Sequence, residues 1–452
     1  MNNTAEKLDE SFIWEKSYPA GRNWDMPIEA APVYTILDKA VAQFSDRPAI
    51  DFEGIKLTYS DLDALVAKIA CGLQGLGVKK GIKVGLFLPN SHYTIAFYFG
   101  ILKAGGTVVN YNPLYAEREL VNQIEDSETD IFITPDIDDL LAKAEKVAGS
   151  TRLQKLVVCP LGGSKDVSDD DIHVTYKSLI DNDGAFTAHD INPAEDIAVL
   201  QYTGGTTGVP KGAMLTHANL YANVSQMAHW YGYIVEPGKE IQVGVLPFFH
   251  VFALTAVMNL SIWFGMEILP VPKFDLKKML VLLDEKKPSF FPAVPAIFNA
   301  IATHVPGKLD LSYVKFCLSG GAPLPADVRR AFEDKTEALL GEGYGLTETS
   351  PVVTCNPPVW GKVRSGSIGL PIPGTMVEIV DMQDGSTVLP TGKKGEICVR
   401  GPQVMKGYYK KPEATAQVVK NGRFHTGDVG YMDEDGYIFI VDCLKDMVLV
   451  NG

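Results

Sequence analysis

A run of Thr and Gly residues at positions 202–212 is the strongest chemical signal in the sequence. It reads Tyr-Thr-Gly-Gly-Thr-Thr-Gly-Val-Pro-Lys-Gly and follows the apolar residues 197–200, for which we expect a strand. Glycine lets the backbone approach a phosphate closely, while the Thr hydroxyls and Lys211 supply donors and positive charge. The run is not a Walker A loop, because Pro precedes its lysine and Gly follows it. It predicts a phosphate-binding turn before a helix that begins near His217, although a flexible Gly/Thr turn is the plainer interpretation.

Four other side chains could take part in chemistry. Glu348 is a hard oxygen ligand of the kind Mg²⁺ prefers, and the carboxylate of Asp428 can accept two hydroxyl donors at once. Tyr344 offers an aromatic face on which another ring could stack. The plainer interpretations are a solvated carboxylate, a turn aspartate and a core tyrosine. His250 follows two Phe residues, where a histidine is more often structural than catalytic.

The composition restricts the partners of this chain. Its 41 Lys and Arg against 55 Asp and Glu give a net charge of −14, which disfavours binding to nucleic acid or anionic lipid. The six cysteines lack metal-ligand or redox spacing, so no zinc site or disulfide framework is expected. The apolar stretch 251–270 is broken by Asn259 and Glu267 and is expected to be a buried helix. We expect a cytoplasmic protein without a secretion signal, a monomer or homodimer, and leave peripheral contact with the inner face of the membrane open.

The pattern of elements predicts an α/β fold. From about residue 32 to 160 helical and strand patterns alternate, with Ser60 expected to cap a helix. A second α/β stretch from about 195 to 350 follows an expected surface loop at 162–184. From about 360 the pattern changes to short strands, at 377–380, 395–400 and 437–441, typical of a small antiparallel sheet or barrel.

We therefore expect residues 1–441 to form one large domain. It would comprise two layered α/β subdomains, at about 30–190 and 191–355, and a small antiparallel β-barrel-like subdomain at about 356–441.

Five motifs occur in the order found in the adenylate-forming enzymes, namely acyl-CoA synthetases, luciferases and peptide-synthetase adenylation domains. After the Gly/Thr loop come residues 319–323, 344–348, 426–428 and 442–446, which resemble the adenine-side loop, the YGxTE motif, the ribose-binding TGD motif and the hinge. Gly205, where most of the family has Ser, and residues 247–254 are most similar to bacterial long-chain fatty-acid–CoA ligases. The resemblance implies that the chain is the large N-terminal domain of such an enzyme.

The resemblance also implies roles for individual residues. Those implied to be catalytic are Lys211, Thr347, Glu348 and His250, with Thr203 and Glu348 as ligands of Mg²⁺. Those implied to bind the nucleotide are Thr203, Gly204, Gly205, Thr206, Thr207, Gly208, Gly320, Gly321, Ala322, Pro323, Glu342, Gly343, Tyr344, Gly345, Asp428 and Cys443. Those implied to line the acyl pocket are Phe249, His250, Phe252, Pro351 and Val352, and Lys445 is implied to be the hinge pivot.

The implied reaction uses ATP, Mg²⁺ and coenzyme A. A fatty-acid-type carboxylate would attack the α-phosphorus of ATP and release pyrophosphate, and the thiol of coenzyme A would then displace AMP. No enzyme nucleophile is required, so the cysteines are expected to be structural. The alternatives are an aryl- or short-chain carboxylate–CoA ligase, a fatty acyl–AMP ligase, a luciferase-like oxidation and, in another class, a non-catalytic nucleotide- or acyl-binding protein.

Two departures from the family stand at the end of the sequence. The resemblance implies a second C-terminal domain of roughly a hundred residues, which supplies the adenylation lysine. The chain ends at Gly452, so we expect residues 442–452 to be the hinge and the stub of an absent lid domain, with weak turnover and retained ligand binding. Cys443 stands where the family usually has a ribose-contacting Arg, and Cys lacks that charged fork of donors.

Overall fold

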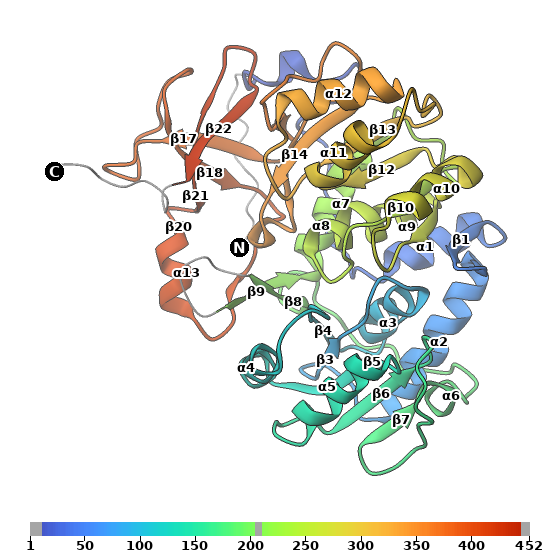
Figure 1. The fold of residues 1–452 in the computed structure, drawn as a ribbon. Coiled ribbons are helices and arrows are strands. Elements are labelled where there is room, and N and C mark those ends of the chain that lie inside the picture. Colours follow the sequence, from blue (N-terminus) through green and yellow to red (C-terminus); the bar gives the residue numbers. More distant parts are fainter. Residues whose placement is uncertain (1–10, 204–209, 444–452) are drawn as a thin grey trace.

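The computed structural model describes residues 11–203 and 210–443 (Figure 1). In these ranges the chain forms two large mixed sheets, flanked and separated by helices, and a small antiparallel sheet to one side. The small sheet, drawn in orange and red, comes from the last part of the sequence. The expected α/β layers and the additional antiparallel sheet are confirmed.

One large sheet is built mostly from the first half of the chain. Among the described residues it has eight strands, in the order β19 (Gly407–Tyr408), β9 (Lys211–Thr216), β8 (Ile197–Thr203), β4 (Thr107–Asn110), β3 (Lys83–Leu86), β5 (Thr129–Pro135), β6 (Lys155–Cys159) and β7 (His173–Thr175). The strands from β8 to β7 are parallel, whereas β9 and β19 join antiparallel at one edge. The direction therefore reverses directly after Thr203.

The other large sheet follows the same plan. Its nine strands in the described chain are β16 (Leu370–Pro371), β15 (Val352–Cys355), β14 (Leu340–Gly345), β13 (Phe316–Ser319), β12 (Phe290–Ala293), β10 (Ile241–Gly244), β11 (Glu267–Pro270), β1 (Pro48–Phe52) and β2 (Ile55–Thr58). The strands from β14 to β1 are parallel. The carboxyl ends of parallel strands are where α/β proteins usually place their ligands.

The small sheet is antiparallel throughout. Its strands are β17 (Met376–Val380), β18 (Gly395–Arg400), β20 (Val419–Lys420), β21 (Arg423–Met432) and β22 (Ile438–Cys443). The division at about residue 190 stays a prediction, because the sheets interleave in sequence. Strands β1 and β2 lie in the nine-stranded sheet, while β19 returns from the region of the small sheet to the eight-stranded one.

The helices cover and separate the sheets. In the described residues they are α1 (Thr35–Phe44), α2 (Tyr59–Gly75), α3 (His92–Lys103), α4 (Glu117–Ser127), α5 (Asp138–Ala148), α6 (Tyr176–Leu179), α7 (His217–Tyr231), α8 (Val251–Ala253), α9 (Leu260–Phe264), α10 (Leu276–Lys286), α11 (Pro295–His304), α12 (Ala326–Thr336) and α13 (Pro412–Val418). Short 3₁₀ turns occur at Glu15–Ser17 and Thr347–Thr349, and a π-helix at Leu254–Asn259 joins α8 to α9.

Helix α3 is the central element of the core. Every one of its residues is buried, and it packs against strands of both large sheets. Ser91 caps its first turn by accepting from the backbone N–H of Thr94. At its other end Lys103 is buried too, but its charge is paired with Asp38 and Asp63, each at 2.7 Å. Burial of each large apolar side chain of such a helix contributes about 1.5–3 kcal/mol.

Three local expectations were wrong. Helix α2 is capped by Thr58, in a capping box with Asp61, so Ser60 lies inside its first turn. The loop at 162–184 contains β7 and α6. The apolar stretch 251–270 is helical only to Phe264, because the left-handed Gly265 ends α9 and β11 follows. No helix in the described part of the chain is long and apolar enough to cross a membrane.

The buried His217 couples stability to pH. It is 2% exposed, and its Nδ1 accepts a hydrogen bond of 3.0 Å from the backbone N–H of Val33. Burial lowers the pKa of His217 from 6.5 to about 4; Asp196 opposes this shift and Lys80 adds to it. The folded chain therefore keeps this ring neutral in a range where the unfolded chain protonates it.

We predict that the free energy of unfolding falls as the pH drops from about 6.5 to about 4, since the unfolded state binds the proton. At about 1.4 kcal/mol per pKa unit, His217 accounts for up to roughly 3 kcal/mol. His217→Asn keeps an acceptor for Val33 but does not titrate, so urea denaturation across this range should give a shallower decline. His92 is also buried, with a pKa of about 4, and its contribution to the pH dependence remains in the His217→Asn variant. The decline left in that variant therefore includes the effect of His92. An unchanged pH dependence in His217→Asn would contradict the assignment.

Candidate active site

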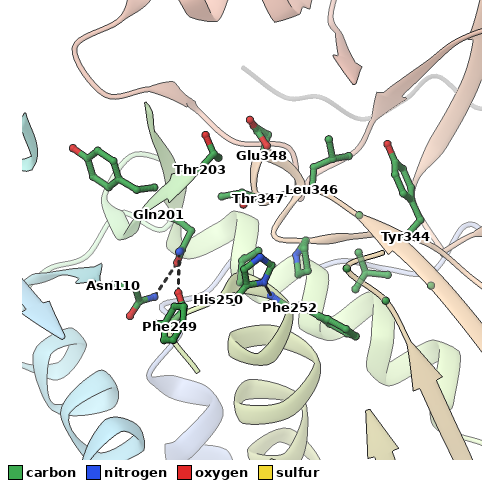
Figure 2. A pocket seen from close by; sticks show the side chains of 18 of the residues that line it. Asn110, Gln201, Thr203, Phe249, His250, Phe252, Tyr344, Leu346, Thr347 and Glu348 are labelled. Carbon is green, nitrogen blue, oxygen red and sulfur yellow. Dashed lines mark hydrogen bonds between the residues drawn. The ribbon is translucent and has the colours of Figure 1, made fainter. Parts of the chain in front are cut away.

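A cavity of about 450 Å³ lies where the carboxyl ends of strands from both large sheets face the small sheet (Figure 2). Strands β4 and β8 contribute residues from one large sheet, β13 and β14 from the other, and β21 contributes Asp428. The turn Thr347–Thr349 and the start of α8 complete its wall.

Most of the predicted site residues that the structure describes meet in this cavity. They are Thr203, Phe249, His250, Phe252, Gly320, Gly321, Gly343, Tyr344, Gly345, Thr347, Glu348, Pro351, Val352 and Asp428. Residues Lys211, Ala322, Pro323 and Glu342 are not part of its lining. Residues Gly204, Gly205, Thr206, Thr207, Gly208 and Lys445 lie outside the described residues. For Cys443 only the backbone is described, opposite Asp428 in the β21–β22 ladder. The nucleotide and acyl roles of all these residues stay predictions.

Several lining residues were not selected from the sequence. They are Asn110, Asn112, Tyr115, Gln201, Tyr202, Val251, Leu318, Leu346 and Cys355. Gln201 and Tyr202 directly precede the Gly/Thr loop, so their position beside an expected strand end was a usable signal. Asn110 belongs to no motif, and it enters the site only because β4 and β8 are neighbours in the sheet.

Two buried amides fix the floor of the cavity. The Nδ2 of Asn110 donates to Oε1 of Gln201 at 2.9 Å, and Nε2 of Gln201 donates to the carbonyl of Phe249 at 2.9 Å (Figure 2). Both amide side chains are 5% exposed. A buried amide that lost its partner would destabilise the protein by about 1–3 kcal/mol. The pair therefore holds the segment before His250 in one position.

His250 presents one ring nitrogen to the cavity. Its Nδ1 accepts from the backbone N–H of Phe252 at 3.3 Å and so caps α8. Desolvation lowers the pKa of His250, which favours the neutral ring at pH 7. With Nδ1 as acceptor, the proton of the neutral ring resides on Nε2. His250 can then donate one hydrogen bond to a carboxylate.

A tyrosine that the sequence analysis did not select orients Glu348. The hydroxyl of Tyr408 donates to Oε1 of Glu348 at 2.6 Å, and Nζ of Lys211 lies 5.1 Å from the centre of the Tyr408 ring. Lys211 was expected in a turn before a helix, but it begins β9, because residues 211–216 pair with β8. Thr203 and Glu348 are hard oxygen donors on the same wall, and this donor set fits Mg²⁺ (Figure 2).

A second tyrosine orients Asp428. The hydroxyl of Tyr344 donates to Oδ2 of Asp428 at 2.6 Å, and burial with the neighbouring carboxylate raises the pKa of Tyr344 well above its usual value. The aspartate thus lies in the cavity wall beside the ring that was expected to face adenine. Glu342 has a different position: its Oε1 accepts from the backbone N–H of Leu324 at 3.1 Å, and burial raises the pKa of Glu342 to about 7.

A second, narrow cavity lies directly behind the first. It has a volume of about 20 Å³, roughly room for one water molecule, and shares Leu318 with the larger cavity. The hydroxyl of Tyr231 in its wall contacts Sγ of Cys355 in the wall of the larger cavity, at 3.3 Å. Its remaining lining is mostly apolar, namely Val235, Gln242, Ala256, Leu260, Phe264, Met266, Phe290, Pro292 and Phe316.

Two large sheets, a small curled sheet and a cavity at their junction form the architecture of the large domain of adenylate-forming enzymes. A long-chain-fatty-acid–CoA ligase (FadD1) from Archaeoglobus fulgidus superposes with a TM-score of 0.84 at 27% identity, covering 94% of this chain and 86% of that one. ATP-bound MatB from Rhodopseudomonas palustris gives a TM-score of 0.83 at 28% identity, covering 93% and 80%.

The sequence comparisons agree with the fold. The long-chain-fatty-acid–CoA ligase of Bacillus subtilis (strain 168) is 42% identical over 461 residues, which cover 97% of this chain and 81% of the relative. The 4-coumarate–CoA ligase 1 of Petroselinum crispum is 32% identical over 432 residues, covering 93% and 77%. The family described as AMP-binding enzyme matches residues 37–409. The chain belongs to this family of adenylate-forming enzymes.

The hydrogen bond from Tyr408 to Glu348 should strengthen the binding of Mg²⁺-ATP. Tyr408→Phe leaves the Glu348 carboxylate without its donor, so its affinity for Mg²⁺-ATP should fall about fivefold, the equivalent of one hydrogen bond of about 1 kcal/mol. Isothermal titration calorimetry with Mg²⁺-ATP measures the change.

Tyr409 offers a matched control for this variant. Its hydroxyl donates to Oε2 of Glu128 at 2.7 Å, and Glu128, unlike Glu348, does not line the cavity. Tyr409→Phe should therefore leave the affinity for Mg²⁺-ATP unchanged. Equal affinities of both variants and the unaltered protein would show that Tyr408 does not act through Glu348.

Proposed function

We propose that this chain activates a long-chain fatty acid, joining its carboxylate first to AMP and then to coenzyme A. The observation that carries the proposal is the proximity of two environments. The larger cavity has a polar wall with Thr347, Glu348 and Asp428, and a second, mostly apolar cavity shares Leu318 with it. Such a site suits a molecule with an anionic head and an aliphatic tail.

The proposed chemistry follows from the wall of the larger cavity. A carboxylate oxygen of the substrate attacks the α-phosphorus of ATP, and the bond from that phosphorus to the pyrophosphate oxygen breaks. His250 donates to the carboxylate through Nε2, Asp428 accepts the ribose hydroxyls, and Thr347 donates to a phosphate oxygen. Lys211, which lies outside the lining, adds positive charge for the phosphates. Mg²⁺ held by Thr203 and Glu348 would offset the charge on the leaving pyrophosphate. The sulfur of coenzyme A then attacks the acyl carbon, and the bond to AMP breaks.

Among the cysteines whose side chains the structure describes, the one in the cavity wall is not suited to act as a nucleophile in this reaction. Of these cysteines, Cys355 lines the cavity, but it is fully buried, and burial raises the pKa of its thiol to about 12. The thiol therefore stays protonated at neutral pH. Direct transfer from adenylate to coenzyme A needs no such group.

The names of the relatives point to two substrate classes, aliphatic acids and aryl acids. Both long-chain-fatty-acid–CoA ligases and 4-coumarate–CoA ligases are more than 30% identical to this chain. The apolar second cavity favours the aliphatic acid, although its present width is too small for a chain. The π-helix at Leu254–Asn259 forms one of its walls, and such wider turns are frequent at functional sites. Entry of an acyl tail would require the side chains of this wall to move apart.

A thermal-shift series with non-hydrolysable acyl-adenylate mimics tests this proposal without requiring turnover. We predict that the rise in melting temperature grows with aliphatic length, since each buried methylene contributes about 0.8 kcal/mol, or about fourfold in affinity. A larger rise in melting temperature with aromatic mimics would indicate that the substrate is an aryl acid and not a fatty acid. No shift with any mimic or with Mg²⁺-ATP would contradict the proposal.

Two variants of the second cavity should change this preference in opposite directions. Ala256→Leu fills the cavity and should favour shorter mimics, whereas Leu260→Ala widens it and should favour longer ones. Ala228→Leu makes the same enlargement in α7, away from both cavities, and should leave the order of mimics unchanged. If all three variants kept the order of the unaltered protein, the tail would not occupy this cavity.

We also propose a cytoplasmic protein that contacts the inner face of the membrane peripherally. Leu114 supports this contact, because it is 86% exposed and precedes Tyr115, a residue of the cavity wall. Sedimentation with lipid vesicles tests the contact, and analytical ultracentrifugation distinguishes a monomer from a homodimer.

A further inference from the structure

A mostly buried carboxylate outside the cavity holds the turn that carries Asp428. The Oε2 of Glu396 lies 2.7 Å from Nδ1 of His425, and its Oε1 accepts from the backbone N–H of Gly427 at 3.0 Å. The two oxygens of one side chain in β18 thus contact residues 425 and 427 of β21. The side chains of Glu396 and His425 are 12% and 7% exposed.

The turn itself has a conformation that needs such support. Gly427 has a φ of 79°, in the left-handed region that favours glycine. The β18–β21 ladder shifts register between Glu396 and Cys398, so regular pairing does not hold the turn. Thr426 adds two contacts, donating to the carbonyl of Ile397 at 2.8 Å and accepting from the backbone N–H of Asp428 at 3.0 Å.

The charge of Glu396 explains why these contacts are strong. A buried carboxylate is stable only where donors satisfy it, and hydrogen bonds to a charged acceptor are roughly twice as strong as neutral ones. Here the donors are the ring of His425 through Nδ1 and the backbone N–H of Gly427, one residue before Asp428. Movement of the turn would therefore leave the carboxylate unsatisfied, which fixes the backbone at the edge of the cavity.

A metal site is the alternative for the same residues. Atoms of Glu396, Cys398 and His425 lie within 4.8 Å of one another, and Sγ of Cys398 is 3.4 Å from Nδ1 of His425. These are ligand types that zinc accepts. However, Oε2 of Glu396 already pairs with Nδ1 of His425, and burial raises the pKa of the Cys398 thiol to about 12. The pair thus holds together without an ion, although Nε2 of His425 is buried without a hydrogen-bond partner.

We propose that Glu396 and His425 are positioning residues that set Asp428 for the ribose hydroxyls of the nucleotide. We call this pair with its bond to Gly427 the Glu396 brace. The inference rests on the proposed function, in which Asp428 accepts those hydroxyls. The brace acts through the backbone of the turn, while Tyr344 fixes the aspartate side chain from the other side.

Calorimetric titration with AMP and with 2′,3′-dideoxy-AMP tests the brace. The unaltered chain should bind AMP about tenfold more tightly, since only AMP offers hydroxyls to the charged Asp428. In Glu396→Gln and His425→Ala this preference should largely disappear through weaker binding of AMP, while binding of the dideoxy nucleotide changes little. His425→Asn retains a donor near the position of Nδ1 and should restore much of the preference.

Glu378 provides a matched control in the same sheet. Its carboxylate in β17 accepts from Nε of Arg423 at 2.6 Å and from Nε of Arg400 at 3.2 Å, away from the turn. Glu378→Gln should lower the melting temperature but keep the preference for AMP. A similar loss of preference in Glu378→Gln and Glu396→Gln would mean that general destabilisation is the cause, which overturns the brace.

The remaining outcomes separate the brace from the proposed function. If the unaltered chain and Glu396→Gln prefer AMP equally, the brace is overturned and the ribose role of Asp428 stands. If the unaltered chain binds both nucleotides equally, the ribose role fails and the brace with it. Stoichiometric zinc in the purified protein that is lost in Cys398→Ser would overturn the brace in favour of a metal site.

Discussion

The complete burial of α3 between two sheets is the constraint on which the cavity depends. A helix can be buried on all sides only if apolar surface covers it from both directions, and here helix α2 and strands of both large sheets supply that surface. The charged end at Lys103 is accommodated by two carboxylates. Because the helix fixes one sheet against the other, the carboxyl ends of β4 and β8 face those of β13 and β14 across the cavity.

Hydrogen bonds from tyrosine to carboxylate recur around this space. In the described chain Tyr344 donates to Asp428, Tyr408 to Glu348, and Tyr202 to Asp126 at 2.6 Å. A phenol orients a carboxylate through one short bond but adds no positive charge. A lysine or arginine in the same place would neutralise the acid. Such tyrosines would leave Glu348 and Asp428 their negative charge for the metal ion and the ribose hydroxyls of the proposed function.

The sequence predicted the site best where chemistry and chain position coincide. Thr203, Tyr344, Thr347 and Asp428 stand in compact motifs, and the fold brings them to one cavity. Asn110 and Tyr408 could not be found this way. Their partners Gln201 and Glu348 are 91 and 60 residues distant in the sequence, and only long-range packing makes these pairs neighbours.

Prediction of the fold from the sequence was limited by the same dependence on long-range packing. The alternation of helix and strand indicated layered sheets, because periodicity is a local property. Which strands share a sheet depends on long-range packing, so the assignment of β1 and β2 to the second large sheet had no local signal. Lys211 was expected in a turn for the same reason, since residues 211–216 become a strand only by pairing with β8.

The position of β19 has a consequence for how the protein is made. Strand β9 lies between β8, which directly precedes it in the order of synthesis, and β19, which follows almost two hundred residues later. During translation the outer edge of β9 must therefore remain unpaired while most of the nine-stranded sheet emerges from the ribosome. An unpaired edge is a template for pairing with other chains. The growing polypeptide thus carries an edge open to aggregation at residues 211–216 until residues 407–408 pair with it.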